Sequence, residues 1–244
     1  MSEEVTLETI LEGRVATYGM LARLYRKEVD QEFLDEMRSI RYPQNTGNDN
    51  VDTGYRMFHH YLCNVWERTL TELATDYARV FLGSGSNAYS AAYPFESVHT
   101  SPRRLMMQDA RDEVLAIYRS AGIVKSDTWK EGEDHIAVEL EFLQILGQRV
   151  LDALAEDDED KAVGNLLTSY NFLMDHLVNW VPMLIAEMQK YSRTEFYKAL
   201  AYLTMGFIET DREFLEDVLE DELSKENEDS EDNTVIVEES DLEV

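Results

Sequence analysis

Apolar residues recur three or four positions apart through almost the whole chain, and this spacing is the strongest constraint on its fold. It places the apolar side chains on one face of a helix. We expect helices over 3–27, around 33–37, and over 52–82, 103–121, 133–154, 163–180, 182–191 and 194–221. Apart from 234–237, no stretch shows the alternation typical of a strand, so the sequence predicts an all-α fold.

Two of these ranges have features that constrain their geometry. The range 52–82 predicts one long helix or two helices stacked on one axis. Pro182 lacks a backbone N–H and is expected to end or kink the helix over 163–180.

Length and composition predict one folded domain with a tail. A chain of 244 residues that is 44% hydrophobic can bury one substantial core. We expect a compact single-domain bundle of about nine to ten helices over 1–221. Residues 222–244 hold ten acidic residues and one basic residue, Lys225, without amphipathic spacing, which predicts a disordered acidic C-terminal tail.

The connection over 83–102 is long and contains Tyr89, Tyr93, Pro94 and Phe95. Connections of about 20 residues inside a compact domain are usually functional or disordered. Aromatic side chains bury a large area at low entropy cost, which suits the binding of a peptide. The alternative, that Tyr93 and Phe95 fill the core of the bundle, stays open. A second connection, 41–50, gathers Pro, Gly and Asn and is expected to be a surface loop.

The net charge is −28, from 50 acidic and 22 basic residues. This balance argues against binding nucleic acid through its phosphates and favours attraction of a basic peptide or protein. Arg outnumbers Lys by 15 to 7, and an acidic surface poor in Lys is also an adaptation to high salt. Both explanations of the acidity stay open.

Several further classes of protein are disfavoured. No apolar run approaches the roughly 20 residues that cross a bilayer, and the acidic N-terminus is unlike a secretory signal. We therefore expect a cytoplasmic protein without stable membrane insertion. Cys63 is the single cysteine, so a disulfide within the chain and a multi-cysteine metal site are excluded, and a buried apolar environment is expected for it.

The sequence offers weak signals for catalysis. It contains no G-x-S-x-G motif, and the Gly-Ser-Gly-Ser stretch at 83–86 follows a helical pattern and lacks the lysine of a P-loop. A di-iron bundle needs two Glu-x-x-His pairs, but Glu96 and His99 form the one pair present. His135 and Glu139, four positions apart, leave a helical metal-dependent enzyme as an alternative. We predict no catalytic residues, no metal site and no cofactor.

A set of motifs carries a resemblance to a known family. The motifs are "YARVFLG" at 77–83, "YPFESV" at 93–98, "EGEDH" at 131–135, "ELEFL" at 139–143, "FLMDHLVNW" at 172–180 and "FYKALA" at 196–201. In order and spacing, over about residues 10–220, they resemble the TorD/DmsD/NarJ-like redox-enzyme maturation chaperones. Gly132 and His99 depart from the proline and the tyrosine that this family commonly has.

The resemblance implies a cytoplasmic chaperone that binds the twin-arginine signal peptide of a molybdopterin-dependent oxidoreductase of the dimethyl-sulfoxide-reductase type. Such a chaperone assists cofactor insertion into the catalytic subunit and delays its export, and is not an enzyme. An assembly adaptor for a non-exported nitrate-reductase-type subunit, as in the NarJ branch, is the alternative. The chain is expected to be a monomer or a domain-swapped dimer.

The resemblance also implies a signal-peptide-binding surface, formed by Phe81, Leu82, Gly83, Pro94, Phe95, Ser97, Asp134 and His135. Pro94 and Phe95 are expected to take the apolar segment of the leader. Asp134 is expected to pair with a leader arginine in a charge-assisted hydrogen bond. His135 is expected to orient Asp134 or to contact the peptide.

Overall fold

The computed structural model describes residues 6–83, 91–126 and 128–232, with side chains through Glu220. Within these ranges the elements are α1 (Leu7–Arg26), α2 (Gln31–Ser39), α3 (Asp49–Cys63), α4 (Thr69–Phe81), α5 (Glu96–Thr100), α6 (Asp109–Ser120), α7 (Ile136–Ala155), α8 (Glu159–Phe172), the π-helix η1 (Leu173–Leu177), α9 (Val178–Tyr191) and α10 (Glu195–Asp232). The β-type pairing in the described ranges is one isolated bridge. The prediction of an all-α bundle is confirmed.

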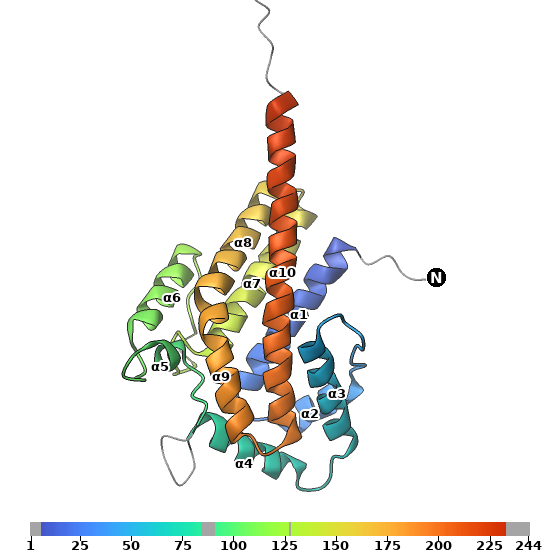
Figure 1. Ribbon diagram of the computed structural model, residues 1–244, viewed down its shortest axis with the longest axis vertical. Coiled ribbons are helices and arrows are strands. Elements are labelled where there is room, and N and C mark those ends of the chain that lie inside the picture. The colour runs from blue at the N-terminus through green and yellow to red at the C-terminus, as the bar shows by residue number, and fades with distance from the viewer. Residues whose placement is uncertain (1–5, 84–90, 127, 233–244) are drawn as a thin grey trace, which may run out of the picture.

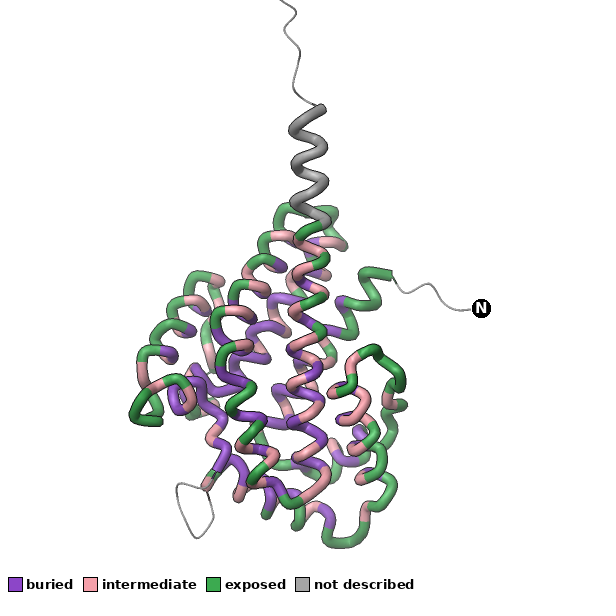
Figure 2. The backbone as a smooth tube through the Cα atoms, viewed as in Figure 1, coloured by how far each residue is buried: buried purple, intermediate pink, exposed green. Residues whose placement is uncertain are grey.

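The helices form one stack around a shared core. Helix α1 packs on α7, α7 packs on α8, and α10 packs on both α3 and α9. Figure 1 shows α5 and α6 on one side of this stack, α2 and α3 on the other, and α4 across its base. Buried residues follow the inward faces of these helices (Figure 2). The amphipathic spacing of the sequence is therefore satisfied by helix-on-helix packing.

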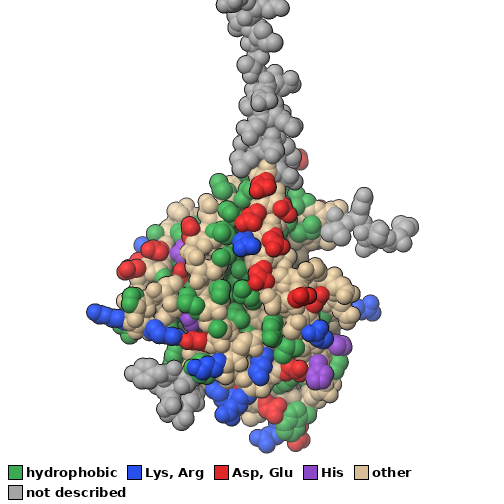
Figure 3. Space-filling view, in the orientation of Figure 1, with side chains coloured by type: hydrophobic (Ala, Val, Ile, Leu, Met, Phe, Trp, Pro, Cys, Tyr) green, Lys and Arg blue, Asp and Glu red, His purple; other side chains and the backbone are tan. Residues whose placement is uncertain are grey.

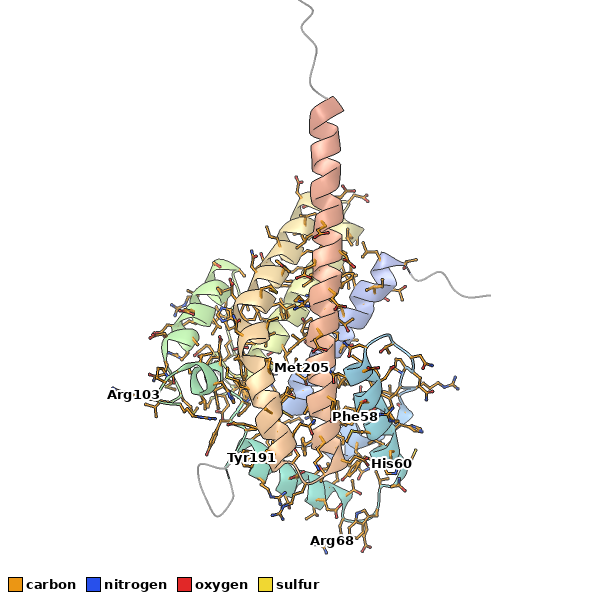
Figure 4. All side chains as sticks on the ribbon, in the orientation of Figure 1. Phe58, His60, Arg68, Arg103, Tyr191 and Met205 are labelled. Atoms are coloured by element: carbon orange, nitrogen blue, oxygen red, sulfur yellow. The ribbon has the colours of Figure 1, made fainter. Side chains whose placement is uncertain are left out.

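Residues 52–82 form two helices, and the prediction that these share one axis is wrong. Helix α3 stands beside α10, whereas α4 runs across the base of the molecule (Figure 1). In the connection, the backbone N–H of Trp66 donates to the hydroxyl of Thr69, whose side chain is buried (2.8 Å). Phe58 of α3 is labelled in Figure 4. Its ring meets that of Phe196 of α10 edge to face, with ring centroids 4.9 Å apart. The break lets α3 pack along α10 while α4 packs against α9 and α10.

The helix predicted over 103–121 begins six residues late. Helix α6 starts at Asp109, and Arg104 and Met107 before it have positive φ angles of 53° and 57°. The side-chain amide of Gln108 donates to the backbone carbonyls of Met106 and Met107, which holds this turn. The apolar residues over 105–107 fit a helical pattern, but the backbone hydrogen bonds are made by side chains instead.

Pro182 does not end its helix. Helix α8, the π-helix and α9 follow one another without a break from Glu159 to Tyr191, and Pro182 lies inside α9. The N–H of Val178 bonds to the carbonyl of Leu173, five residues earlier, which is the wider turn of a π-helix. The insertion of this turn, which ends five residues before the proline, changes the local register of the helix.

Two further expectations concern Cys63 and the C-terminal segment. Cys63 is exposed at the end of α3, where its Sγ lies 3.7 Å from a ring nitrogen of His59, so the prediction of a buried cysteine is wrong. The predicted tail, 222–244, begins within α10, which continues to Asp232. Residues 233–244 lie outside the described residues, and the division of the chain at 221 stays a prediction.

A buried ion pair joins the first helix to the last. The guanidinium of Arg14 donates to both carboxylate oxygens of Asp211, at 2.5 and 3.2 Å, across 197 positions of sequence. The hydroxyl of Tyr18 donates to the same carboxylate at 2.5 Å. All three side chains are at least 96% buried. A buried charge without its partner is strongly destabilising, so this network fixes α1 against α10.

Removal of the carboxylate should destabilise the fold. Asp211→Ala leaves the Arg14 guanidinium and the Tyr18 hydroxyl without their acceptor, and we expect a loss of roughly 3–5 kcal/mol in the free energy of unfolding, measured in urea. The control Asp217→Ala removes an exposed acid from the same helix and should change that free energy by about 0.5 kcal/mol or less. Equal effects of the two substitutions would contradict the assignment.

Candidate functional site

Two of the motifs, separated by almost 40 residues of sequence, lie side by side. Phe95 and His135 form the isolated antiparallel bridge. The backbone N–H of Glu96 donates to the carbonyl of Asp134, and that of Ile136 donates to the carbonyl of Pro94, both at 2.9 Å. The chain before α5 and the chain before α7 are therefore held together by their backbones.

Asp134 has a structural role in this arrangement. It is 1% exposed, and one carboxylate oxygen accepts the backbone N–H of Ser97 at 3.0 Å, in the first turn of α5. The other oxygen lies so close to Gly132 that a Cβ there would be 2.8 Å from it. Asp134 therefore caps α5 from the neighbouring segment, and its side chain faces the interior.

Ser97 extends the same support to the next connection. Its side chain is fully buried, and its hydroxyl accepts the backbone N–H of Gln108 at 3.1 Å, just before α6. Its own N–H is bonded to Asp134. Ser97 thus connects the two ends of the 95–108 segment and has no exposed surface for a ligand.

His135 forms the cap of α7. Its Nδ1 accepts the backbone N–H of Ala137 at 3.0 Å, and its ring meets the rings of Phe95 and Trp129 edge to face at 4.9 and 4.7 Å. Burial, with a smaller contribution from the charge of Arg26, lowers the pKa of His135 to about 3. The imidazole is therefore neutral at physiological pH.

A hollow of about 520 Å³ opens beside these segments. Five of the eight predicted site residues line it: Phe81, Leu82, Pro94, Phe95 and His135. Together with Tyr77, Glu28 and Glu131, they define what we call the motif pocket. Phe81 and Phe95 are nearly buried and form its floor, whereas Leu82 is 58% exposed at its edge.

Gly83, Ser97 and Asp134 lie outside the lining of the motif pocket. Gly83 follows α4 with a φ of +66°, and a Cβ at this position would meet the Tyr93 hydroxyl at 2.5 Å. Both the left-handed backbone and the close approach of Tyr93 require a glycine here. Gly83 therefore ends α4 and positions Leu82.

Sequence reasoning missed the part of the pocket that comes from the α1–α2 connection. Residues 26–30 line the pocket together with the motif residues and Trp129. No periodicity or motif marks these positions. Tyr77 and Glu131 did have a signal, since both lie in motifs that carry the family resemblance.

Two carboxylates at the pocket are free of cations. Glu28 and Glu131 are exposed, and among the described residues neither lies within ion-pair distance of a basic group. Burial raises the pKa of Tyr77 to about 12, and the charges of Glu28 and Glu131 add to this shift. The two carboxylates therefore face the same tyrosine from different segments of the chain.

A third carboxylate of the lining, Asp30, is already engaged. It accepts the backbone N–H of Phe33 as the cap of α2 and binds the side chains of Arg23 and Lys27. These hydrogen bonds, led by that of Phe33, lower its pKa to about 2. The pocket thus combines an apolar floor with two free negative charges from Glu28 and Glu131.

Buried acidic side chains link α5 and α7 to the π-helix and α9. Nδ1 of His176, in the π-helix, lies 2.9 Å from the carboxylate of Glu96, and both side chains are buried. The Trp180 indole N–H donates to Glu139 at 3.0 Å. Burial raises the pKa of Glu139 well above its usual range, and the neighbouring carboxylates of Glu96 and Asp134 raise it further. This environment therefore disfavours the charged form of Glu139.

The metal-enzyme alternative receives no geometric support. His135 bonds to the backbone of α7, whereas Glu139 bonds to Trp180, so their polar atoms have separate partners. In the described part of the chain, no three His, Cys, Asp or Glu side chains are grouped so that they could hold a metal ion.

None of the described helices is both long and apolar enough to span a membrane.

The neutral state of His135 predicts a pH dependence of stability. Its folded pKa is about 3, against about 6.5 in an unfolded chain, so between these values the unfolded state binds a proton that the folded state does not. The contribution of His135 to stability should fall as the pH drops through this range. His135→Asn keeps a capping acceptor but cannot bind this proton. We expect it to lower the slope of the free energy of unfolding against pH by up to about 1.4 kcal/mol per pH unit.

Urea unfolding at pH 4.5, 5.5 and 6.5 measures this slope for each protein. The matched control is His59→Asn, which replaces an exposed histidine outside the site. A wild-type slope in His135→Asn, or the same reduction in the control, would contradict the assignment.

Comparison with known proteins places the chain in a family. A family model described as nitrate reductase delta subunit matches residues 48–186. The chain is similar to the chaperone protein TorD of Photobacterium profundum, 30% identical over 144 residues that make up 59% of this chain and 64% of that protein. It is also similar to the TorD proteins of Shewanella piezotolerans (25% identity, 88% and 97% coverage) and Aliivibrio salmonicida (23%, 86% and 97%). The chain therefore belongs to the family of TorD-like redox-enzyme maturation chaperones.

Proposed function

We propose that this protein is a cytoplasmic chaperone for a molybdopterin-dependent oxidoreductase of the dimethyl-sulfoxide-reductase type. In this proposal it binds the twin-arginine signal peptide of the catalytic subunit, assists insertion of the cofactor and delays export until the subunit is folded. The relatives are named chaperones, which supports a binding protein over an enzyme.

The observation that carries the proposal is the composition of the motif pocket. A signal peptide has a basic region followed by an apolar one. Pro94, Phe95 and Leu82 offer an apolar surface to the leader, including the methylene stems of its arginines. Glu28 and Glu131 offer carboxylates for the guanidinium groups, and carboxylate–arginine pairs are charge-assisted.

The local arrangement of charge matters more than the net charge. On the face in Figure 3, acidic side chains gather along α10, whereas most Lys and Arg lie toward the lower half. On this face the charged side chains are thus unevenly spread. Exposed charges are screened beyond about 8 Å at physiological ionic strength, so the acids at the pocket itself are those that recognise the arginines.

The proposal changes the roles expected for Asp134, His135 and Ser97. Asp134 faces the interior and caps α5, so we assign the pairing with leader arginines to Glu28 and Glu131 instead. Asp134 and Ser97 position the segment that carries Phe95. His135 presents a neutral ring to the pocket and does not bond to Asp134 in this arrangement.

An assembly adaptor is the second candidate. The description of the matching family model, nitrate reductase delta subunit, favours a partner of the nitrate-reductase type. The same pocket would then bind a segment of a subunit that is not exported. The presence or absence of a twin-arginine leader on the partner distinguishes the two candidates.

Neutralising the two free carboxylates should weaken leader binding. For Glu28→Gln combined with Glu131→Gln, we expect roughly a 3- to 30-fold higher Kd for a synthetic twin-arginine leader at low salt, because two exposed ion pairs are lost. Isothermal titration calorimetry measures the change, and the difference from wild type should shrink as salt is added.

The matched control for this double variant is Glu8→Gln combined with Glu113→Gln. It changes the net charge by the same amount at two exposed positions outside the pocket. An equal loss of affinity in both double variants would show that the change in net charge, and not the position of Glu28 and Glu131, causes the loss. Wild-type affinity in Glu28→Gln/Glu131→Gln would remove the assigned arginine site.

Asp134→Ala should act on the pocket indirectly. Loss of the carboxylate leaves the N–H of Ser97 without its acceptor, so we expect the free energy of unfolding to fall by about 1–3 kcal/mol and leader affinity to fall with it. Urea unfolding and calorimetry on one preparation measure both quantities. A large loss of affinity with unchanged stability would instead indicate direct contact between Asp134 and the peptide.

A further inference from the structure

A second hollow, of about 370 Å³, lies next to the motif pocket. We call it the side pocket; its apolar walls are Tyr118, Ile123, Val124, Val138, Phe142 and Ile145. They come from α6, from the connection that follows it, and from α7. None of these six residues carries a predicted role from the motifs.

Arg26 and Trp129 line both hollows, so they form the ridge between them. The guanidinium of Arg26 lies 5.0 Å from the centre of the Trp129 ring and forms an ion pair with Glu141 of α7. Lys125 donates to the carbonyl of Trp129 at 2.8 Å from the side-pocket face. The ridge is therefore fixed from α1, from α7 and from the connection between α6 and α7.

The two hollows differ in the charge that they offer. Glu141 is the acid of the side pocket, and Arg26 already pairs with it. Lys125 adds one further positive charge there. The motif pocket is also lined by Arg26 and by Lys27, which pairs with Asp30, but it has in addition the carboxylates of Glu28 and Glu131. An arginine is thus favoured in the motif pocket and repelled from the side pocket, where apolar walls remain for contact.

We propose that the side pocket binds the apolar segment that follows the arginines in the leader, so that one peptide crosses the Arg26–Trp129 ridge. This inference rests on the proposed function and adds the direction in which the leader lies. Signal peptides place an apolar stretch of 7–15 residues after their basic region, and the two hollows present the complementary surfaces in that order.

Exposed apolar side chains stand on both sides of the ridge. Leu82, at the edge of the motif pocket, is 58% exposed, and Val124, at the side pocket, is 84% exposed. When a partner covers an exposed apolar side chain, apolar surface is removed from water. A leader that runs from one hollow to the other covers both residues.

The test compares two peptides on variants of the side pocket. One peptide is a full synthetic leader, and the other ends before the apolar segment. Val124→Asn should raise the Kd of the full leader roughly fivefold to tenfold, because burial of one valine is lost, and should leave the Kd of the short peptide unchanged. Ile145→Gln, at a second residue of the lining, should act in the same way.

The control is Leu167→Asn, which replaces an exposed apolar residue on α8 that lines neither hollow. It should leave both Kd values at the wild-type level. As an independent measurement, a photo-crosslinking residue in the apolar segment should attach to the side-pocket walls, whereas one beside the arginines should attach around Leu82.

The outcomes separate this inference from the proposed function. If the full leader binds but Val124→Asn and Ile145→Gln leave its affinity unchanged, the side pocket is not its site and the proposed function stands. Crosslinks from the apolar segment to the motif pocket alone would likewise overturn the inference. If the full leader does not bind the wild-type protein, the proposed function fails and this inference fails with it.

Discussion

The candidate site depends on the pairing between the segment before α5 and the segment before α7. Three hydrogen bonds hold it: Glu96 to the carbonyl of Asp134, Ile136 to the carbonyl of Pro94, and Ser97 to the Asp134 carboxylate. An isolated bridge is too short to be stable alone. It persists here because the bundle buries it and because each bond satisfies a backbone group at a helix start. The floor of the motif pocket follows directly, since Phe95 and His135 are the bridged residues.

The buried acids beneath this bridge couple it to the core. Glu96 pairs with His176 in the π-helix, and Glu139 bonds to Trp180. π-turns of this kind often mark functional regions, and here the π-turn carries the histidine that reaches α5. Burial raises the pKa of Glu139 above its value in the unfolded chain, so this acid contributes more to stability as the pH falls through its folded pKa. His135 acts in the opposite direction, because its pKa is lower in the folded state than in the unfolded state.

Much of the fold follows from the 3.6-residue period, and the motifs predicted which segments matter. The predicted helices over 3–27 and 133–154 correspond closely to α1 and α7. Periodicity is local, however, and does not say what a helix packs against. For that reason the turn between α3 and α4, the late start of α6 and the exposure of Cys63 escaped prediction. The apolar residues over 105–107 matched the helical spacing, yet Gln108 and positive φ angles hold them in a turn.

The candidate site, like the fold, was predictable only in part. The motifs identified five residues that line the pocket, but they could not show that Asp134 faces inward, because burial depends on the neighbouring helices. Nor could they reveal Glu28, which reaches the pocket from the end of α1 through tertiary packing. A motif identifies a residue as a carboxylate, but it does not show which way that side chain points.

The ion pair between Arg14 and Asp211 can form only late in the synthesis of the chain. Its two residues are 197 positions apart, and a ribosome that adds 5–20 residues per second takes about 10–40 s to make that much chain. Throughout this interval the carboxylate that accepts from Arg14 does not yet exist. The ion pair can therefore form only after Asp211 has left the ribosome, later than α7, the main packing partner of α1, becomes available.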